Sequence, residues 1–408
     1  MSEIIRSAVN SVTYLMKRFP VVAVLGARQV GKTTLLHQML PTAPFFDLER
    51  EADYDRVKSD PEFFLFQYKE TLVLDEAQVC PDLFPALRVA IDKHRKLNGQ
   101  YLLSGSSSPL LIRNLSESLA GRIALFELSP LQLQECWGAS SGFYDWLREG
   151  KIGDYSSLTA VISWDQLIQT CFYGGFPDPF LHRSDKDYFG FWMSNYFKTY
   201  IERDIRKLFS GLNIEAYKRF IRMLATSSGA LFKASNFSKS LDVSEPTVKS
   251  YLEIAEGTFF WRILPSFQKN IKKRLVKMPK GHIRDSGILN YLLNIADIET
   301  LKAHPSFGTI WEIFIIEQII RGLQMKLIDF RYFYYRTHNQ AEVDLILEGP
   351  WGIIPIEIKL GVRIDKRQLS NLENFIKEYK CPFGLIINNA EKPELLSSHV
   401  IQIPAGCL

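Results

Sequence analysis

The 408-residue sequence is longer than one hydrophobic core usually serves, so two or three domains are expected. Its net charge of +4 is too small to establish a polyanionic partner, and evidence for nucleic-acid binding has to come from local clusters. No apolar run approaches the ~18 residues that a membrane helix needs, and the N-terminal segment has no uninterrupted apolar stretch. A cytoplasmic protein with no membrane partner is therefore expected. Five widely spaced cysteines without a C-x-x-C pair argue against a zinc site or a disulfide framework.

Residues 1–130 show the pattern of an α/β domain. Short apolar runs alternate here with longer polar or helical stretches, as they do when buried parallel strands are joined by helices. The runs are VVAVLG, PFFDL, TLVLD, QYLLSG and IALFEL. The alternation predicts a parallel sheet.

The first apolar run leads directly into the motif G-x-x-x-x-G-K-[ST], and a helix follows it. This context predicts a P-loop, in which two glycines let backbone N–H groups turn toward phosphates and Lys32 reaches the β- and γ-phosphate oxygens. The Thr33 hydroxyl is placed for Mg²⁺. ATP and Mg²⁺ are therefore the expected ligands. The predicted nucleotide-binding residues are Gly26, Ala27, Arg28, Gln29, Val30, Gly31, Lys32, Thr33, Thr34 and Asp75.

Two acids follow the apolar run TLVL. In such a pair the first acid, Asp75, holds Mg²⁺ together with Thr33, and the second, Glu76, activates the attacking water. The next strand runs into SGSSSP, residues 104–109, where one hydroxyl is a candidate sensor of the γ-phosphate. Arg122 has two interpretations. It contacts phosphate in its own or a neighbouring subunit, which would make the protein a homo-oligomer, or it forms a surface ion pair.

Residues 131–213 change to aromatic-rich helical segments and are interpreted as a helical connector. The aromatic residues between positions 191 and 200 have helical spacing and are predicted to pack in a core, not to stack on bases. Residues 214–290 contain three helical patterns and then an extended basic segment. Positions 233–251 have the form of a helix, a tight turn and a helix, with Ser244 as a candidate cap and Glu245 and Pro246 in the first turn. Residues 300–408 open with a helix, followed by three strands, a helix near 366–379 and a further strand, which predicts a small α/β domain.

Several strings along the chain resemble one known family. GARQVGKTTLL, LVLDEAQ, LLSGSSSPLL and LAGRI are similar to the bacterial and archaeal AAA+-type ATPases that carry an uncharacterised C-terminal domain, and the resemblance spans nearly the whole chain. GGFP, YIERD, IRDSG, GTIWE, YRTHNQAEVD and IEIK resemble later marks of that family in the same order. Ser286 stands where Thr was expected, which puts nothing in doubt. The resemblance implies an ATPase domain, a winged-helix-like segment and a restriction-endonuclease-like fold, and it implies no substrate.

The C-terminal residues that carry this resemblance form a second candidate active site. Asp344 and Glu357 on adjacent strands are predicted to share a divalent metal, with Glu312 as an outer ligand. Lys359, on the same strand face as Glu357, is predicted to orient water or stabilise negative charge. The alternative is that Glu357 and Lys359 form a structural pair in a nuclease fold that has lost activity.

The extended basic segment is the candidate contact with DNA. Between positions 266 and 284 there are seven Lys or Arg residues and no acid, beside the helix-turn-helix pattern that carries Lys249. Basic runs are also often solvated faces, and helix-turn-helix folds also serve as packing modules. The seven residues are Lys269, Lys272, Lys273, Arg274, Lys277, Lys280 and Arg284.

Three functions are compatible with this sequence. The first is an ATP-regulated enzyme that processes DNA and loses cleavage when Asp344 is changed. The second is a nucleotide-switched docking protein with an inactive nuclease-like domain. The third, a chaperone-like remodeller, predicts ATP turnover that polypeptide stimulates and DNA does not.

Overall fold

The computed structural model describes residues 4–106, 118–150, 152–206, 209, 211–268, 278–336 and 342–408. The chain divides into two compact units, Met1–Pro130 with Glu253–Phe259, and Leu131–Leu252 with Phe260–Leu408. Over the described ranges, no helix combines the length and the apolar composition that a bilayer crossing demands.

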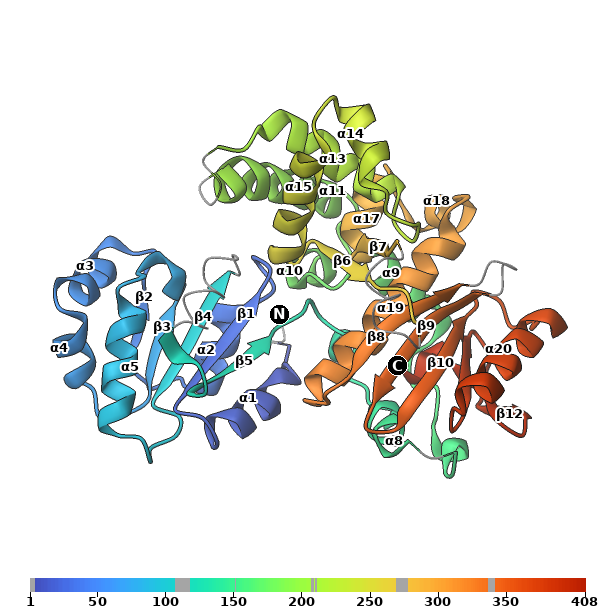
Figure 1. Ribbon diagram of the computed structural model, residues 1–408, viewed down its shortest axis with the longest axis horizontal. Coiled ribbons are helices and arrows are strands. Elements are labelled where there is room, and N and C mark those ends of the chain that lie inside the picture. Colours follow the sequence, from blue (N-terminus) through green and yellow to red (C-terminus); the bar gives the residue numbers. More distant parts are fainter. Residues whose placement is uncertain are drawn as a thin grey trace. The chain divides into compact units, whose positions relative to one another are not determined.

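The first unit is built on a parallel five-stranded sheet with the order β2-β3-β4-β1-β5 (Figure 1). The predicted parallel α/β fold is therefore confirmed, and each of the five apolar runs forms a strand. All six residues of β1 are buried, as expected for a parallel sheet covered on both faces. The strands are β1 (Val21–Gly26), β2 (Phe45–Asp47), β3 (Leu72–Asp75), β4 (Tyr101–Ser106) and β5 (Ile123–Glu127).

Helices pack on this sheet through their apolar faces. In α5 (Leu83–Lys93), Leu83, Leu87 and Ile91 recur every four residues and are buried in one core with the side chains of the sheet. The other helical segments are α1 (Ala8–Met16), α2 (Lys32–Met39), α3 (Glu51–Ser59), α4 (Pro61–Phe66) and the 3₁₀ turn η1 (Ala77–Val79).

The second unit begins with short helices. They are α7 (Leu133–Trp137), α8 (Phe143–Glu149), η2 (Tyr155–Ser157), α9 (Trp164–Tyr173), α10 (Pro177–Leu181), α11 (Tyr188–Thr199) and the π-helical η3 (Tyr200–Ile205). Three more helices follow, α13 (Ile214–Thr226), α14 (Ala234–Leu241) and α15 (Glu245–Gly257), the last of which belongs to the first unit from Glu253 on. The antiparallel ribbon of β6 (Trp261–Leu264) and β7 (Lys280–Ile283) comes next. This is the predicted order of three helices and an extended segment.

The turn between α14 and α15 has the predicted form. Asp242 has a φ of 55° where α14 ends, in the left-handed region that Asp tolerates better than most residues. The Thr247 N–H donates to Ser244 Oγ at 3.2 Å, so Ser244 caps α15 and Glu245 and Pro246 lie in its first turn.

The C-terminal part of the second unit is a mixed sheet with the order β12-β13-β11-β10-β9-β8 (Figure 1). β8, β9 and β10 are antiparallel, and β10, β11 and β13 are parallel. The helices are α17 (Ser286–Leu292), α18 (Ile298–Ala303), α19 (Phe307–Met325), α20 (Lys366–Tyr379) and η4 (Ala405–Cys407). The strands are β8 (Arg331–Arg336), β9 (Glu342–Gly349), β10 (Gly352–Ile358), β11 (Gly384–Asn388), β12 (Glu394–Ser397) and β13 (Val400–Pro404). The sequence analysis did not predict β12 and β13, which are only four and five residues long.

Candidate functional site

The P-loop connects β1 to α2 at the carboxyl edge of the parallel sheet. Gly31 has a φ of 91°, a conformation that glycine adopts without steric cost, and Gln29 has a φ of 63°. A Cβ on Gly26 would lie 2.4 Å from the carbonyl oxygen of Leu128. The loop backbone therefore requires both glycines of the motif.

Lys32 is buried at the first position of α2, with 5% of its surface exposed. Its Nζ donates to the carbonyl oxygens of Gly26 at 3.3 Å and Ala27 at 3.1 Å, and lies 3.9 Å from Glu76 Oε1. Burial lowers the pKa of Lys32, and the charges of Glu76 and Asp75 oppose that shift. The ammonium group is thus held over the loop, close to the acids at the end of β3.

Asp75 accepts hydrogen bonds from hydroxyl groups on two neighbouring elements. Thr33 Oγ1 donates to Asp75 Oδ2 at 2.6 Å, and Ser104 Oγ of β4 donates to Asp75 Oδ1. The carboxylate is 3% exposed and lies beside the hydroxyl predicted to bind Mg²⁺. A hydroxyl and a carboxylate are oxygen ligands of the kind that Mg²⁺ prefers, so these residues fit a phosphate-bound Mg²⁺.

Glu76 is fixed by hydrogen bonds from Ser106 and from Gln78, for which no role was predicted. Its Oε2 accepts from Gln78 Nε2, from Ser106 N at 3.2 Å and from Ser106 Oγ at 3.1 Å. Its backbone has a φ of 52°, a conformation that is costly for a non-glycine residue. Burial acts to raise the pKa of Glu76, but the charge of Lys32 and the hydrogen bonds from Gln78 and Ser106 lower it below its ordinary value. Glu76 is therefore a fixed carboxylate at neutral pH.

A buried arginine braces the P-loop from the N-terminal segment. Arg6 donates to the carbonyl oxygens of Val30 and Ser129, both at 2.7 Å, and is 5% exposed. No sequence motif marks Arg6, because its partners are backbone groups 24 and 123 positions away. Of the remaining predicted loop residues, Gln29 and Thr34 are exposed and Arg28 is partly buried.

Arg122 lies at the opposite edge of the sheet. It directly precedes β5, whose first residue pairs with Val21 at the start of β1, whereas the P-loop follows the end of that six-residue strand, roughly 17–20 Å away. Its guanidinium group binds Asp92 of α5 at 2.9 to 3.1 Å. The prediction that Arg122 contacts phosphate within its own subunit is wrong, because the length of β1 separates Arg122 from the P-loop. A contact with a neighbouring subunit stays a prediction.

The four predicted C-terminal site residues lie close to one another at β9, β10 and α19. Lys359 Nζ lies 2.8 Å from Glu357 Oε1, and Asp344 Oδ2 accepts from the Ile358 N–H at 2.8 Å. Burial and then the charge of Asp344 raise the pKa of Glu312 to about 8, and the same two causes raise the pKa of Glu357 to about 7. The acids thus share one poorly solvated region, which we call the acid cluster.

Glu342 also belongs to the acid cluster, although it was not predicted as a site residue. It stands two positions before Asp344 on β9, so strand alternation was a signal for it. Within the described residues, no three or more His, Cys, Asp or Glu side chains converge closely enough to hold a metal ion. A metal on Asp344 and Glu357 therefore stays a prediction.

Two of the seven basic residues predicted to contact DNA are buried inside the second unit. Lys280 contacts Glu342 and lies 3.9 Å from Glu312 Oε1, and Arg284 Nε lies 3.9 Å from Glu317 Oε2. They are 8% and 7% exposed, so the prediction that they bind DNA is wrong, because a buried charge requires an internal partner. The other five lie outside the described residues: Lys269, Lys272, Lys273, Arg274 and Lys277. Lys249 is exposed on α15.

A basic groove lies elsewhere in the second unit, between α11, α13 and α17. It has a volume of about 610 Å³, and Lys198, Arg219 and Arg222 line it with exposed cationic side chains, beside the ion pair of Lys218 with Glu215. The rings of Phe197 and Tyr291 stack in its wall, with their centroids 5.5 Å apart. Phe197, which was predicted to pack in a core, is only partly buried. The groove was not predicted, because its residues come from three segments.

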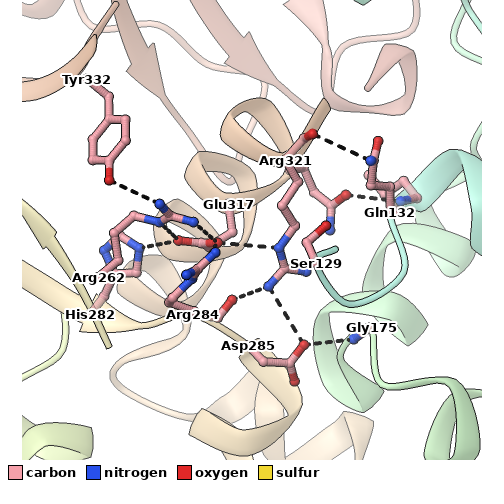
Figure 2. Close-up of polar contacts among 12 residues, drawn as sticks. Ser129, Gln132, Gly175, Arg262, His282, Arg284, Asp285, Glu317, Arg321 and Tyr332 are labelled. Carbon is pink, nitrogen blue, oxygen red and sulfur yellow. Dashed lines mark hydrogen bonds and ion pairs between the residues drawn. The ribbon is translucent and has the colours of Figure 1, made fainter. Parts of the chain in front are cut away.

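A buried ionic network centres on Glu317 of α19 (Figure 2). Arg262 of β6 binds both carboxylate oxygens, His282 Nε2 lies 2.9 Å from Oε1, and Arg321 Nε lies 3.3 Å from Oε2. Burial acts to raise the pKa of Glu317, but Arg262, His282, Arg284 and Arg321 hold it well below its ordinary value. Burial lowers the pKa of His282. The network attaches the ribbon to α19.

Asp285 extends this network to the helical connector. Its carboxylate accepts from the N–H groups of Gly287 and Ile288 at 3.0 and 3.2 Å and so caps α17. It also accepts from the Gly175 N–H at 2.9 Å, and Arg321 Nη2 lies 3.9 Å away (Figure 2). The strings GGFP and IRDSG, which carried part of the family resemblance, therefore meet at one structural joint.

Comparison with known proteins identifies three matched segments. A family model described as an AAA domain matches residues 18–137, and models described as domains of unknown function, DUF8612 and DUF4143, match residues 165–299 and 307–408. The uncharacterized proteins Rv2008c of Mycobacterium tuberculosis and Mb2031c of Mycobacterium bovis are each 35% identical over 406 residues, which is 98% of this chain and 83% of each relative. The chain belongs to the family of these two proteins. The AAA-domain match, together with the P-loop, supports ATP binding and hydrolysis.

Solved structures also resemble parts of the chain. The Walker-type ATPase PABY2304 of Pyrococcus abyssi is 15% identical, with a TM-score of 0.44, over 71% of this chain and 95% of its own. The RuvB Holliday junction branch migration motor of Thermotoga maritima is 17% identical, with a TM-score of 0.31, over 64% of this chain and 90% of its own.

Proposed function

We propose that the first unit hydrolyses ATP with Mg²⁺ at the carboxyl edge of its parallel sheet. The observation that carries this proposal is the pairing of Lys32 and Glu76 across the P-loop, with Thr33 and Asp75 hydrogen-bonded beside them. Lys32 is placed to turn from the loop carbonyls to the β- and γ-phosphates. Bound Mg²⁺ supplies charge neutralisation of the phosphate oxygens.

The other proposed roles, binding Mg²⁺ and accepting a proton, belong to side chains around the P-loop. Thr33 and Asp75 would hold Mg²⁺, and Ser104 fixes the second carboxylate oxygen of Asp75. Glu76 accepts the proton of the attacking water, and its lowered pKa keeps it ionised for that task. Ser106 orients Glu76, and Ser104 and Ser106 are both candidates for the one hydroxyl predicted to sense the γ-phosphate.

We also infer a second candidate function, metal-dependent DNA cleavage at the C-terminal sheet. The supporting observation is the acid cluster at β9, β10 and α19, beside the Lys359–Glu357 pair. The helix-strand-strand-strand-helix-strand order from α19 to β11 is the order that a restriction-endonuclease-like fold requires. The three helices and ribbon before it suit a winged-helix-like segment. A docking role without chemistry is the alternative.

The nucleic-acid contact that we infer is the basic groove, not the ribbon. Exposed lysine and arginine side chains beside aromatic rings suit phosphates and unstacked bases. Helix α15, the expected recognition helix, exposes Glu245 and Glu253 as well as Lys249, so its charge does not favour DNA.

One set of preparations tests both functions. ATP turnover and cleavage of single-stranded, duplex and branched DNA, with Mg²⁺ or Mn²⁺, are measured for wild type, Glu76→Gln, Lys32→Ala and Asp344→Ala. We expect Glu76→Gln to lower the ATPase kcat by about 100-fold or more, as for loss of a general base. Asp344→Ala is expected to abolish cleavage while leaving ATP turnover intact.

Glu51→Gln on the exposed face of α3 is the matched control for the ATPase and is expected to behave like wild type. Unchanged turnover in Glu76→Gln would remove Glu76 from the mechanism. No DNA cleavage by wild type under any condition, with ATP hydrolysis intact, would leave the acid cluster as part of a docking domain.

A further inference from the structure

Lys280 reaches the acid cluster from a different part of the second unit. It is the first residue of β7, which pairs with β6, and residues 265–267, directly after β6, are hydrogen-bonded to Tyr334 of β8 at the edge of the C-terminal sheet. The Tyr334 N–H donates to the Pro265 carbonyl at 2.9 Å, and the Phe267 N–H donates to the Tyr334 carbonyl at 2.7 Å. Tyr334 Oη donates to the Met278 carbonyl at 2.6 Å. These bonds fix the position from which the Lys280 side chain extends.

The ammonium group of Lys280 lies among the acids. It contacts Glu342 of β9 and lies 3.9 Å from Glu312 of α19, with its Nζ 5.6 Å from the centre of the Tyr334 ring. The residue is 8% exposed, and burying an ammonium group is costly unless opposite charges surround it. The side chain is therefore a fixed cation within the cluster.

Lys280 and Lys359 together bring two positive charges to the acid cluster. Lys359 pairs with Glu357 on β10, and Lys280 faces Glu312 and Glu342 on the other side. A divalent cation would bring the same total charge. Of the predicted metal ligands, Glu357 and Glu312 face these lysines, and within the described ranges no three acids converge as a ligand set.

We propose that Lys280 is a built-in cation of the acid cluster, which competes with a divalent metal ion and keeps the C-terminal site metal-free while the ribbon lies against β8. This inference rests on the second candidate function proposed above. It assigns Lys280 as a positioning residue of the acid cluster.

The test measures Mn²⁺ binding to nucleotide-free, full-length protein from the EPR signal of free Mn²⁺. Lys280→Met removes the charge and keeps a side chain of similar length. It is expected to bind Mn²⁺ at least tenfold more tightly than wild type, and Mn²⁺ is expected to raise its Tm more. Adding Asp344→Asn to Lys280→Met is expected to abolish the gain. Lys326→Met, which removes an exposed lysine paired with Asp145, is the matched control and is expected to bind like wild type.

Equal Mn²⁺ affinities for wild type and Lys280→Met, or weaker binding by the variant, would overturn the proposal. So would a gain that persists with Asp344→Asn, because the ion would then bind elsewhere. If Lys280→Met does not fold, Lys280→Gln removes the charge, keeps a polar side chain beside Glu342 and is expected to tighten Mn²⁺ binding in the same direction. An unchanged affinity in that variant rejects the proposal.

Measuring DNA cleavage in parallel distinguishes failure of the Lys280 proposal from failure of the proposed nuclease function. Tighter Mn²⁺ binding by Lys280→Met without cleavage supports Lys280 as the competing cation and removes the nuclease. Cleavage by wild type with unchanged Mn²⁺ affinity in Lys280→Met supports the nuclease and rejects the role of Lys280.

Discussion

Ser106 shows how one neighbouring side chain tunes the proposed catalytic acid. Its N–H and Oγ both donate to Glu76 Oε2, and Gln78 Nε2 donates to the same oxygen. Ser104, two residues earlier on β4, donates a hydrogen bond from its Oγ to Asp75 Oδ1. Residues 104 and 106 share a strand face, so one strand orients both acids at the end of its neighbour β3.

Ser106→Ala is predicted to lower the ATPase kcat by about tenfold, because a hydrogen bond to a charged group contributes about 1.5 kcal/mol. The hydroxyl favours the ionised form of Glu76, so its loss raises the pKa of Glu76. The acid limb of the kcat–pH profile should therefore move to higher pH. Ser59→Ala, at the exposed end of α3, should leave kcat and the profile unchanged. A slower Ser106→Ala enzyme with an unshifted profile would contradict this role.

At the scale of elements, α13 replaces the ribbon as the basic surface. The sequence places positive charge on residues 266–284, but Lys280 and Arg284 are turned inward toward acids of α19 and β9. Arg219 and Arg222 of α13 face outward into the groove. Local charge density in a sequence therefore does not decide which charges meet solvent, because acids far along the chain recruit some of them.

Charge reversal of α13 by Arg219→Glu with Arg222→Glu is predicted to weaken DNA binding at least tenfold at about 0.1 M salt. The slope of log K against log salt should also become less steep, since fewer phosphate charges are neutralised. Fluorescence anisotropy of labelled single-stranded and duplex DNA measures both quantities. Lys366→Glu with Arg367→Glu, on the exposed start of α20, makes the same change of charge and should have a smaller effect. Equal losses in the two double variants would mean that only net charge matters.

At the scale of the whole molecule, the Glu317 network joins segments that are far apart in the sequence. Arg262 and His282 come from the ribbon, Arg321 from α19, and Asp285 connects Arg321 to Gly175 of the helical connector. Two buried acids, Glu317 and Asp285, which share Arg321, therefore connect the ribbon, α17 and α19.

Glu317→Gln is predicted to destabilise the second unit by about 3–5 kcal/mol, because it leaves buried arginines without their counter-charge. Urea unfolding followed by tryptophan fluorescence measures the change. Glu299→Gln, which removes an exposed partner of Lys302, is the matched control and should cost less than about 1 kcal/mol. Comparable losses in the two variants would mean that the buried network adds no stability.

The same network predicts that acid weakens the wild-type second unit. His282 has a folded pKa below its ordinary value of 6.5, so the unfolded chain takes up a proton first as the pH falls, and unfolding becomes easier. Glu317, with its lowered pKa, acts in the same direction at lower pH. The urea midpoint of wild type should thus fall between pH 7.5 and pH 5.5.

The sequence by itself determined the P-loop, its flanking strand and helix, the acids that end β3, the capped turn at Ser244 and most of the C-terminal strands. These features follow from short-range spacing, which fixes backbone conformation and strand faces locally. The tertiary structure alone decided that Arg122 lies at the far edge of its sheet, that Arg6 braces the loop, and that Lys280 enters the acid cluster. Those outcomes depend on strand order and on contacts between residues more than twenty positions apart. A buried charge is stable only beside a partner, and the local sequence does not show which distant residue that partner is.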